Sequence, residues 1–266
     1  MEEGKVAIVA GGATSIGAAI VRAFIARGDR AVAADIDEAA GAALVRELGD
    51  RVHFCRLDLA SDDDIHASVR ETVRLFGRID YVVAAAASYL DEGPASPRDH
   101  WRAGFDVNVF GPVMLVHAAY DQLRRNKGCV VHLGSISGEV AQKGRWVYPA
   151  AKAALHQVTR SQALEFAADG VRVNTVVPGW TWAGGMEKLG LTRPLVDRVA
   201  APFHLTGRAA DREEVADVVL FLCSPAARIV NGAMLPADGG YLALGPEARA
   251  SALADALQAA SEEGGS

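Results

Sequence analysis

A tyrosine and a lysine four residues apart, Tyr148 and Lys152, are the residues of this chain best suited to proton transfer. Four residues make about one helical turn, so the two side chains would lie on one face of a helix. A free tyrosine, with a pKa of about 10, is a poor base at neutral pH, and a nearby ammonium group favours the phenolate. Ser135, thirteen residues before Tyr148 and behind a strand-like run, completes a possible proton-transfer site. Alone, most tyrosine and lysine pairs at this spacing simply belong to an ordinary packed or solvated helix face.

The elements that must position these side chains alternate in type along the chain. Short apolar runs are separated by amphipathic segments of helical length, which indicates a parallel sheet covered by helices on both faces. We therefore predict an α/β fold: one Rossmann-type, doubly wound domain with a seven-stranded parallel sheet. The strands are expected at residues 5–10, 30–34, 52–57, 81–86, 129–133, 171–177 and 233–236.

The composition favours a cytoplasmic protein without metal or disulfides. Half of the 266 residues are hydrophobic, and the formal net charge of -6 comes from interspersed charges. Such a distribution argues against a nucleic-acid surface and gives no support for membrane attraction. The first four residues lead into an apolar strand without a basic segment, and no apolar run reaches about 18 residues. Cys55, Cys129 and Cys223 lie far apart and the histidines form no cluster, so no metal site is predicted.

The domain is expected to extend over residues 1–244. Residues 245–266 differ from the rest because they are rich in Ala, Glu, Gly and Ser. Such a composition predicts a C-terminal tail that is either a weak helix or disordered.

A glycine-rich turn, Gly11 to Gly17, follows the first strand and precedes a helix. Small residues there let the backbone approach a pyrophosphate at the helix N-terminus. Asp35, at the end of the second strand, can accept hydrogen bonds from the ribose of NAD and would repel the additional phosphate of NADP. We therefore expect NAD as the cofactor. The alternative is that Asp35 merely begins the following helix, since Asp35-Ile36-Asp37-Glu38 is also a good capping sequence.

With these motifs in order, the chain resembles the short-chain dehydrogenase/reductase family from Val6 to Tyr241. The resemblance rests on the glycine turn, Asp58-Leu59, Asn108, Ser135, Tyr148 with Lys152, Asn174 through Pro178-Gly179, and Asp238-Gly239-Gly240. It implies a catalytic tetrad. Tyr148 would be the acid/base, Lys152 would lower its pKa and hold the nicotinamide ribose, Ser135 would position the substrate oxygen, and Asn108 would anchor a water-linked proton relay.

The resemblance also implies a cofactor site and shows where this chain departs from the family pattern. Ser15 stands where the family has the middle glycine of the turn, alanines occupy 84–87 in place of Asn-Asn-Ala-Gly, and Ala183 replaces a usual threonine. The expected cofactor-binding residues are Gly11, Ser15, Ile16, Gly17, Asp35, Asp58, Leu59, Ala85, Tyr148, Lys152, Pro178, Gly179 and Thr181.

The resemblance also implies a substrate lid at about residues 180–207. The expected substrate pocket is mainly apolar, which suits a hydrophobic secondary alcohol that is cyclic or aromatic. Lys143, Arg145 and Arg193 could pair with an anionic substrate, but long basic side chains on loops are more often solvated. The predicted substrate-binding residues are Tyr89, Val140, Trp146, Trp180, Trp182 and Met186.

The favoured function is an NAD(H)-dependent oxidoreductase that interconverts a secondary alcohol and its ketone by hydride transfer. One alternative is a non-catalytic NAD-binding regulatory or structural protein. Another is an epimerase or dehydratase that uses NAD transiently, which is less favoured because the chain is too short for an added substrate domain. The family habit and the small residues between Tyr148 and Ala168 favour a homo-oligomer, with a tetramer expected.

Overall fold

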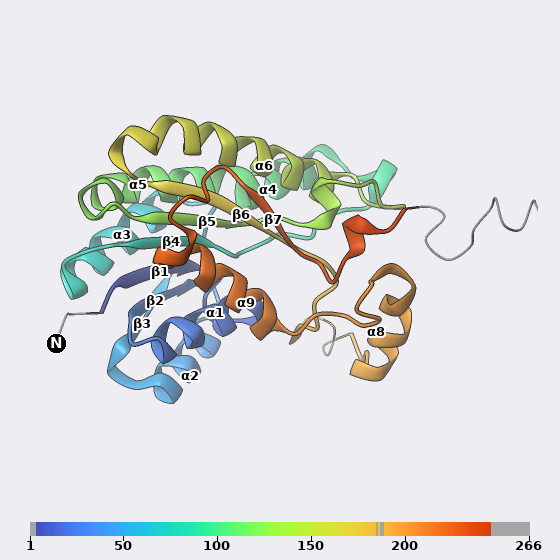
Figure 1. Cartoon of the computed structure of the whole chain (residues 1–266), viewed down its shortest axis with the longest axis horizontal. Helices are drawn as coiled ribbons and strands as arrows, with labels where there is room; N and C mark the ends of the chain where they lie inside the picture. Colours follow the sequence, from blue (N-terminus) through green and yellow to red (C-terminus); the bar gives the residue numbers. More distant parts are fainter. Residues whose placement is uncertain (1–3, 185, 187–188, 246–266) are drawn as a thin grey trace, which may run out of the picture.

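The computed structural model describes residues 4–184, 186 and 189–245, and its centre is a seven-stranded parallel sheet (Figure 1). The strand order is β3-β2-β1-β4-β5-β6-β7. The strands are β1 (Val6–Ala10), β2 (Arg30–Asp35), β3 (Val52–Arg56), β4 (Tyr81–Ala84), β5 (Cys129–Leu133), β6 (Arg172–Pro178) and β7 (Met234–Ala237). The predicted α/β fold with seven parallel strands is confirmed.

The predicted strand bounds differ from the observed ones by at most two residues. The largest difference is in the fourth strand, predicted for residues 81–86, which ends at Ala84. The N–H of Ala85 still donates to the carbonyl of Ala10 at 2.8 Å, and the chain then leaves the sheet. An apolar alanine run continues beyond the last strand pair, so hydrophobicity alone could not mark this end.

Helices cover both faces of the sheet (Figure 1). The helices α1, α2 and α9 lie on one face and α3, α5 and α6 on the other, with α4 beside α6. Their bounds are α1 (Ser15–Ala26), α2 (Glu38–Leu48), α3 (Asp62–Phe76), α4 (Arg98–Phe105), α5 (Gly111–Asn126), α6 (Val147–Phe166), α8 (Arg193–Ala200) and α9 (Arg212–Leu222).

The strands are apolar along their whole length because successive side chains enter two different cores. Val9 and Ala33 pack toward α1 and α9, whereas Ile8 and Val32 pack toward α3 and α5. All four are fully buried. A strand covered on both faces therefore shows a continuous apolar run rather than an alternating one.

The strand order reverses between β1 and β4, and ligands of open α/β sheets bind at such a point, outside the carboxyl ends of the strands. A ligand site is therefore expected among the loops that follow β1, β4, β5 and β6. Within the described ranges, no helix is long and apolar enough to cross a membrane. The predicted C-terminal tail, apart from Gly245, lies outside the described residues.

Candidate active site

The four predicted catalytic residues lie at the carboxyl edge of the sheet, and all are buried. Ser135 lies two residues after the end of β5, and Tyr148 and Lys152 lie on one face of the first turns of α6. Asn108 lies in a π-helical turn, Asp106–Phe110, between α4 and α5. The exposed fractions are 9% for Ser135, 7% for Tyr148, 2% for Lys152 and 0% for Asn108.

Lys152 and Tyr148 are close, but burial dominates the ionisation of both. The Lys152 Nζ lies 5.5 Å from the centre of the Tyr148 ring and donates to the Leu133 carbonyl at 2.8 Å. Burial lowers the pKa of Lys152 to about 8. Burial also raises the pKa of Tyr148, while hydrogen bonding to Ser135 and the charge of Arg145 lower it. The Tyr148 phenol is therefore neutral in this structure near neutral pH. The expected lowering of its pKa by Lys152 stays a prediction.

A chain of hydrogen bonds orients the hydroxyl group of Ser135. Ser135 Oγ donates to Ser137 Oγ at 3.1 Å, and Ser137 Oγ donates to Gln142 Oε1 at 2.8 Å. The N–H of Ser137 in turn donates to Ser135 Oγ at 3.1 Å. Two serines two residues apart are too common for the sequence to single out Ser137 and Gln142.

The Asn108 side chain holds the loop that follows β4. Its Oδ1 accepts from the Ser88 N–H at 3.0 Å, and its Nδ2 donates to the Ser88 carbonyl at 2.9 Å. A π turn is typical of functional sites in helices, because it shifts the main-chain bonding pattern locally. The amide is thus engaged with the loop, and the predicted relay role of Asn108 stays a prediction.

The glycine turn forms a close backbone cradle at the N-terminus of α1. A Cβ atom on Gly11, whose φ is +73°, would lie 2.5 Å from the Ala86 nitrogen, and one on Gly17 would lie 1.9 Å from the Gly11 oxygen. Both positions therefore require glycine. Main-chain N–H groups at a helix N-terminus favour an anion, so these residues fit the pyrophosphate of a dinucleotide.

Asp35, the last residue of β2, is hydrogen-bonded to this glycine turn. It is 8% exposed, and its Oδ2 accepts from the Ala13 N–H at 3.0 Å. Asp37, rather than Asp35, caps α2 by accepting from the Ala40 N–H at 2.9 Å. Asp35 is thus not the N-cap of α2, although its Oδ1 accepts from the Asp37 N–H at 3.1 Å. Its predicted contact with the ribose of a dinucleotide stays a prediction.

The remaining predicted cofactor residues lie near the ends of β3, β4 and β6, apart from Ile16 in α1. Asp58 Oδ1 accepts from the Ala60 N–H at 2.9 Å, and Leu59 is buried. Thr181 is buried too, and its Oγ1 donates to the Gly179 carbonyl at 3.3 Å. The other members of this group are Ile16 at the start of α1, Ala85 after β4, and Pro178 at the end of β6.

The alanine run at 84–87 does not interrupt the sheet. Ala84 pairs with Ala10 of β1 and with His132 of β5. Main-chain pairing thus holds the strands together where the family uses asparagine side chains.

Ser15 has a φ of +51°, in the left-handed region that favours glycine. We expect Ser15→Gly to raise the free energy of unfolding by about 1 kcal/mol and Tm by about 2–4 °C, because it relieves this strain. Thermal unfolding would measure the change. Gly77→Ser, at a φ of +74° with open space around it, is the reverse control and should lower Tm. A lower Tm for Ser15→Gly would show that the serine hydroxyl contributes more than the backbone strain costs.

The predicted substrate residues fall into two groups. The Tyr89 ring stacks on Tyr148 with 4.8 Å between ring centres, and Val140 and Trp146 are exposed near the start of α6. In contrast, the lid residues Trp180, Trp182 and Met186 pack against Val196, Ala200 and Ala209. The structure thus places Tyr89 against Tyr148, and it places the three residues of the predicted lid in a small separate core with Val196, Ala200 and Ala209.

The basic residues near the site also differ from one another. Arg193 forms ion pairs with Asp197 and Asp211, so it is not available for a substrate anion. Lys143 and Arg145 are exposed. In the part of the chain that the structure describes, no three metal-binding side chains are grouped.

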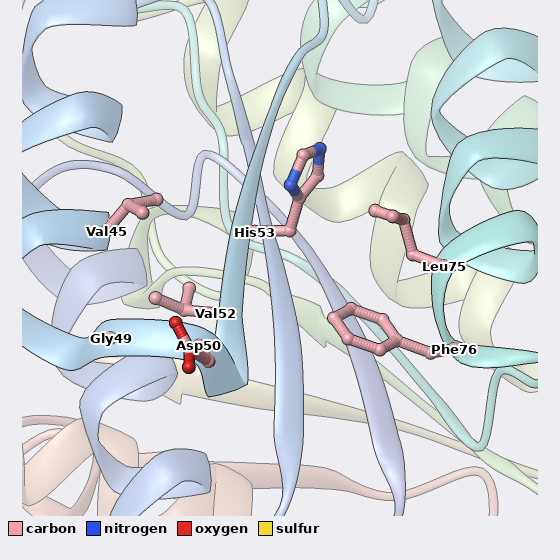
Figure 2. A pocket seen from close by; sticks show the side chains of 7 residues that line it. All are labelled: Val45, Gly49, Asp50, Val52, His53, Leu75 and Phe76. Atoms are coloured by element: carbon pink, nitrogen blue, oxygen red, sulfur yellow. The ribbon is translucent and has the colours of Figure 1, made fainter.

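A separate pocket of about 310 Å³ lies at the amino end of β3 (Figure 2). Its lining side chains come from both sides of this edge strand: Val45, Gly49, Asp50, Val52, His53, Leu75 and Phe76. The strands are parallel, so this pocket lies at the opposite edge from Ser135 and Tyr148 and contributes nothing to that site.

The fold and the buried Ser135, Tyr148 and Lys152 set define an oxidoreductase of the Rossmann type. The family model described as enoyl-(acyl carrier protein) reductase matches residues 11–242. The chain belongs to the short-chain dehydrogenase/reductase family, whose dehydrogenases use nicotinamide cofactors.

Similar proteins support the same assignment. The chain is 35% identical to L-fucose dehydrogenase of Bos taurus, over 95% of each protein. It is also 35% identical to cis-4-hydroxycyclohexanecarboxylate dehydrogenase of Sinomonas cyclohexanicum, over 90% of this chain and 97% of that protein. The crystal structure of a short-chain dehydrogenase/reductase from Burkholderia thailandensis is 34% identical, with a TM-score of 0.82 over 91% of this chain and 94% of the other.

Proposed function

We propose that this protein is an NAD-dependent dehydrogenase that interconverts a hydrophobic, cyclic or aromatic secondary alcohol and its ketone. The observation that carries the proposal is the buried phenol of Tyr148, which lies between Ser135 and Lys152 at the carboxyl edge of the sheet. A buried acid/base beside a dinucleotide cradle suits a reaction in which a hydride and a proton leave the same alcohol.

In the oxidative direction, the carbinol C–H bond breaks as a hydride leaves, and the O–H proton passes to the Tyr148 oxygen, so that a C=O bond forms. The nicotinamide, when bound, accepts the hydride. Ser135 positions the substrate oxygen, and the positive charge of Lys152 favours the phenolate that receives the proton. In the reverse direction the neutral phenol of Tyr148 donates the proton to the carbonyl oxygen.

The proposal of NAD rather than NADP rests on Asp35. Its carboxylate is the charged group at the end of β2, and a phosphate beside it would meet electrostatic repulsion. The glycine cradle and the carboxylate together fit a dinucleotide whose ribose carries free hydroxyl groups.

The proposed substrate class is supported by the exposed aromatic and apolar side chains near Tyr148 and by the similar proteins. Two of these are dehydrogenases of cis-4-hydroxycyclohexanecarboxylate and of 2,5-dichloro-2,5-cyclohexadiene-1,4-diol, both alcohols of six-membered rings. The test is to offer NAD with cyclic, aromatic and aliphatic secondary alcohols and with L-fucose, and to follow NADH absorbance. NADH formation with ring alcohols is expected. Binding of NAD without turnover of any alcohol would favour the non-catalytic alternative.

The pH dependence of the two directions should be opposite. Burial raises the pKa of Tyr148, so the phenol is protonated near neutral pH and the phenolate fraction increases with pH. We expect kcat/KM for alcohol oxidation to rise by up to about tenfold per pH unit, and ketone reduction to fall at high pH. The rise should flatten above pH 8, because Lys152, with a pKa of about 8, then loses its charge. Initial rates in both directions would measure this, and oxidation that falls between about pH 6 and pH 8 would contradict it.

A homotetramer is also proposed. Large apolar side chains are exposed on the outer side of α5 and α6: Phe110 just before α5, Met114 in α5 and Leu164 in α6. Apolar helix faces of this kind are typical of contacts between subunits. Light scattering would measure the mass in solution, and a monomer would contradict the proposal.

A further inference from the structure

The helix that carries Tyr148 has no capping side chain of its own. Trp146 occupies the N-cap position of α6 and makes no side-chain cap bond, and Pro149 in the first turn has no N–H. The first N–H groups of a helix lack acceptors within the helix, and Ser, Thr, Asp or Asn usually supplies one. The turn that positions Tyr148 therefore needs an acceptor from elsewhere in the chain.

Asp91, which is more than fifty residues away in the sequence, supplies this acceptor. Its Oδ1 and Oδ2 accept from the Trp146 N–H at 3.0 and 2.9 Å, and Oδ2 also accepts from the Tyr148 N–H at 3.0 Å. Oδ1 accepts in addition from the Gly93 N–H at 2.9 Å. Both oxygens thus accept from main-chain donors, which fix the orientation of the carboxylate.

The surroundings of the Asp91 side chain also favour its negatively charged form. Partial burial would raise the pKa of Asp91, but the N–H groups of Trp146, Tyr148 and Gly93 outweigh it and hold this pKa below its ordinary value. The N-terminus of a long helix adds a favourable dipole for an anion. Asp91 is therefore ionised wherever the enzyme is folded near neutral pH.

Asp91 belongs to a short segment that contacts the catalytic residues at three points. Ser88 exchanges two hydrogen bonds with Asn108, and the ring of Tyr89 stacks on Tyr148. Asp91 adds the contact to the backbone of Tyr148 itself. The segment that follows β4 is thereby held against the start of α6, so these contacts restrain both the segment and the first turn of α6.

We propose that Asp91 is a positioning residue: its carboxylate caps α6 from outside the helix and fixes the first turn, and with it Tyr148, relative to Ser135. As far as it concerns catalysis, this proposal rests on the proposed function. A displacement of the phenol would separate it from the substrate oxygen, and a misplacement of about 1 Å can reduce a rate about 100-fold.

Amide hydrogen exchange at single-residue resolution tests the cap without any substrate. In the wild-type protein, the amides of Trp146 and Tyr148 should be protected although they stand at a helix N-terminus. In Asp91→Asn their protection should fall, because an amide N–H would replace one acceptor oxygen. Rapid exchange of both amides in the folded wild-type protein would overturn the proposal, whether or not the variant folds.

Kinetics test the positioning role. We expect kcat of Asp91→Asn to fall about 10- to 100-fold. The Kd for NADH should change much less than kcat, because no hydrogen bond of Asp91 reaches the glycine cradle or Asp35. Formate should partly restore kcat of Asp91→Ala by supplying the missing carboxylate. Glu92→Gln is the matched control: Glu92 is the adjacent carboxylate, with a side chain 61% exposed, and its loss should leave kcat unchanged.

A folded Asp91→Asn enzyme with wild-type kcat would overturn the positioning role. If the wild-type protein oxidises no alcohol and yet shows the amide protection that depends on Asp91, the proposed function fails and the cap stands. The two proposals can therefore fail separately.

Discussion

Tyr148→Phe is expected to lower kcat for alcohol oxidation and ketone reduction by about 10²- to 10⁴-fold, the usual contribution of general acid-base catalysis. The variant removes only the oxygen that exchanges the proton. The ring remains to pack against Tyr89 and beneath the Lys152 ammonium. The Kd for NADH should therefore change little, and fluorescence titration beside steady-state kinetics would measure both quantities.

The matched control is Tyr120→Phe. Tyr120 lies in α5 and its hydroxyl donates to Asp169, away from the carboxyl edge of the sheet. This variant loses a phenol oxygen as well, so it should retain wild-type kcat. A Tyr148→Phe enzyme that keeps most of its activity would show that another group exchanges the proton.

Asp35→Asn is expected to reduce the preference for NAD over NADP by about 100-fold, measured as the ratio of the two kcat/KM values. A carboxylate and a phosphate at about 4 Å repel by about 4 kcal/mol at an effective dielectric of 20, and salt screens part of this. Asparagine keeps one oxygen that can accept from the Ala13 N–H of the glycine turn, and it gives up the bond from the Asp37 N–H. A change in Tm would therefore be measured beside the preference.

Asp50→Ala provides the control for this change in charge, because Asp50 is an exposed carboxylate at the far edge of the sheet. Its cofactor preference should equal that of the wild-type protein. A wild-type enzyme that prefers NADP, or an Asp35→Asn enzyme with unchanged preference, would remove the basis for assigning NAD.

The sequence predicted the fold because the determinants of this fold are local. The apolar runs around Ile8 and Val131 mark strands buried on both faces, and the glycine turn marks the first strand-to-helix connection. Tyr148, Lys152 and Ser135 could be singled out for the same reason, since Tyr148 and Lys152 are one turn apart and Ser135 lies just after a strand. Asn108 was expected only from the family resemblance.

The rest of the site depends on contacts between residues that are distant in the sequence. Nothing local to Asp91 indicates that it caps a helix more than fifty residues later; the only signal is that Trp146 cannot cap α6 itself. The hydrogen bonds between Asn108 and Ser88 could not be predicted from the sequence either, because the two residues are 20 positions apart. The effect of burial on Tyr148 could not be predicted either, because burial depends on how the loop after β4 packs over α6.

The most direct test of the central claim is to follow the hydrogen of the carbinol carbon. The best alcohol of the panel would be prepared with deuterium at that carbon and incubated with the wild-type protein and NAD, and the reduced cofactor analysed by mass spectrometry. We expect one deuterium in each NADH together with an equal amount of ketone, and both products at least about 100-fold more slowly with Tyr148→Phe. Deuterium that returns to an epimerised or dehydrated product without net NADH, or ketone formed with unlabelled NADH, would contradict it.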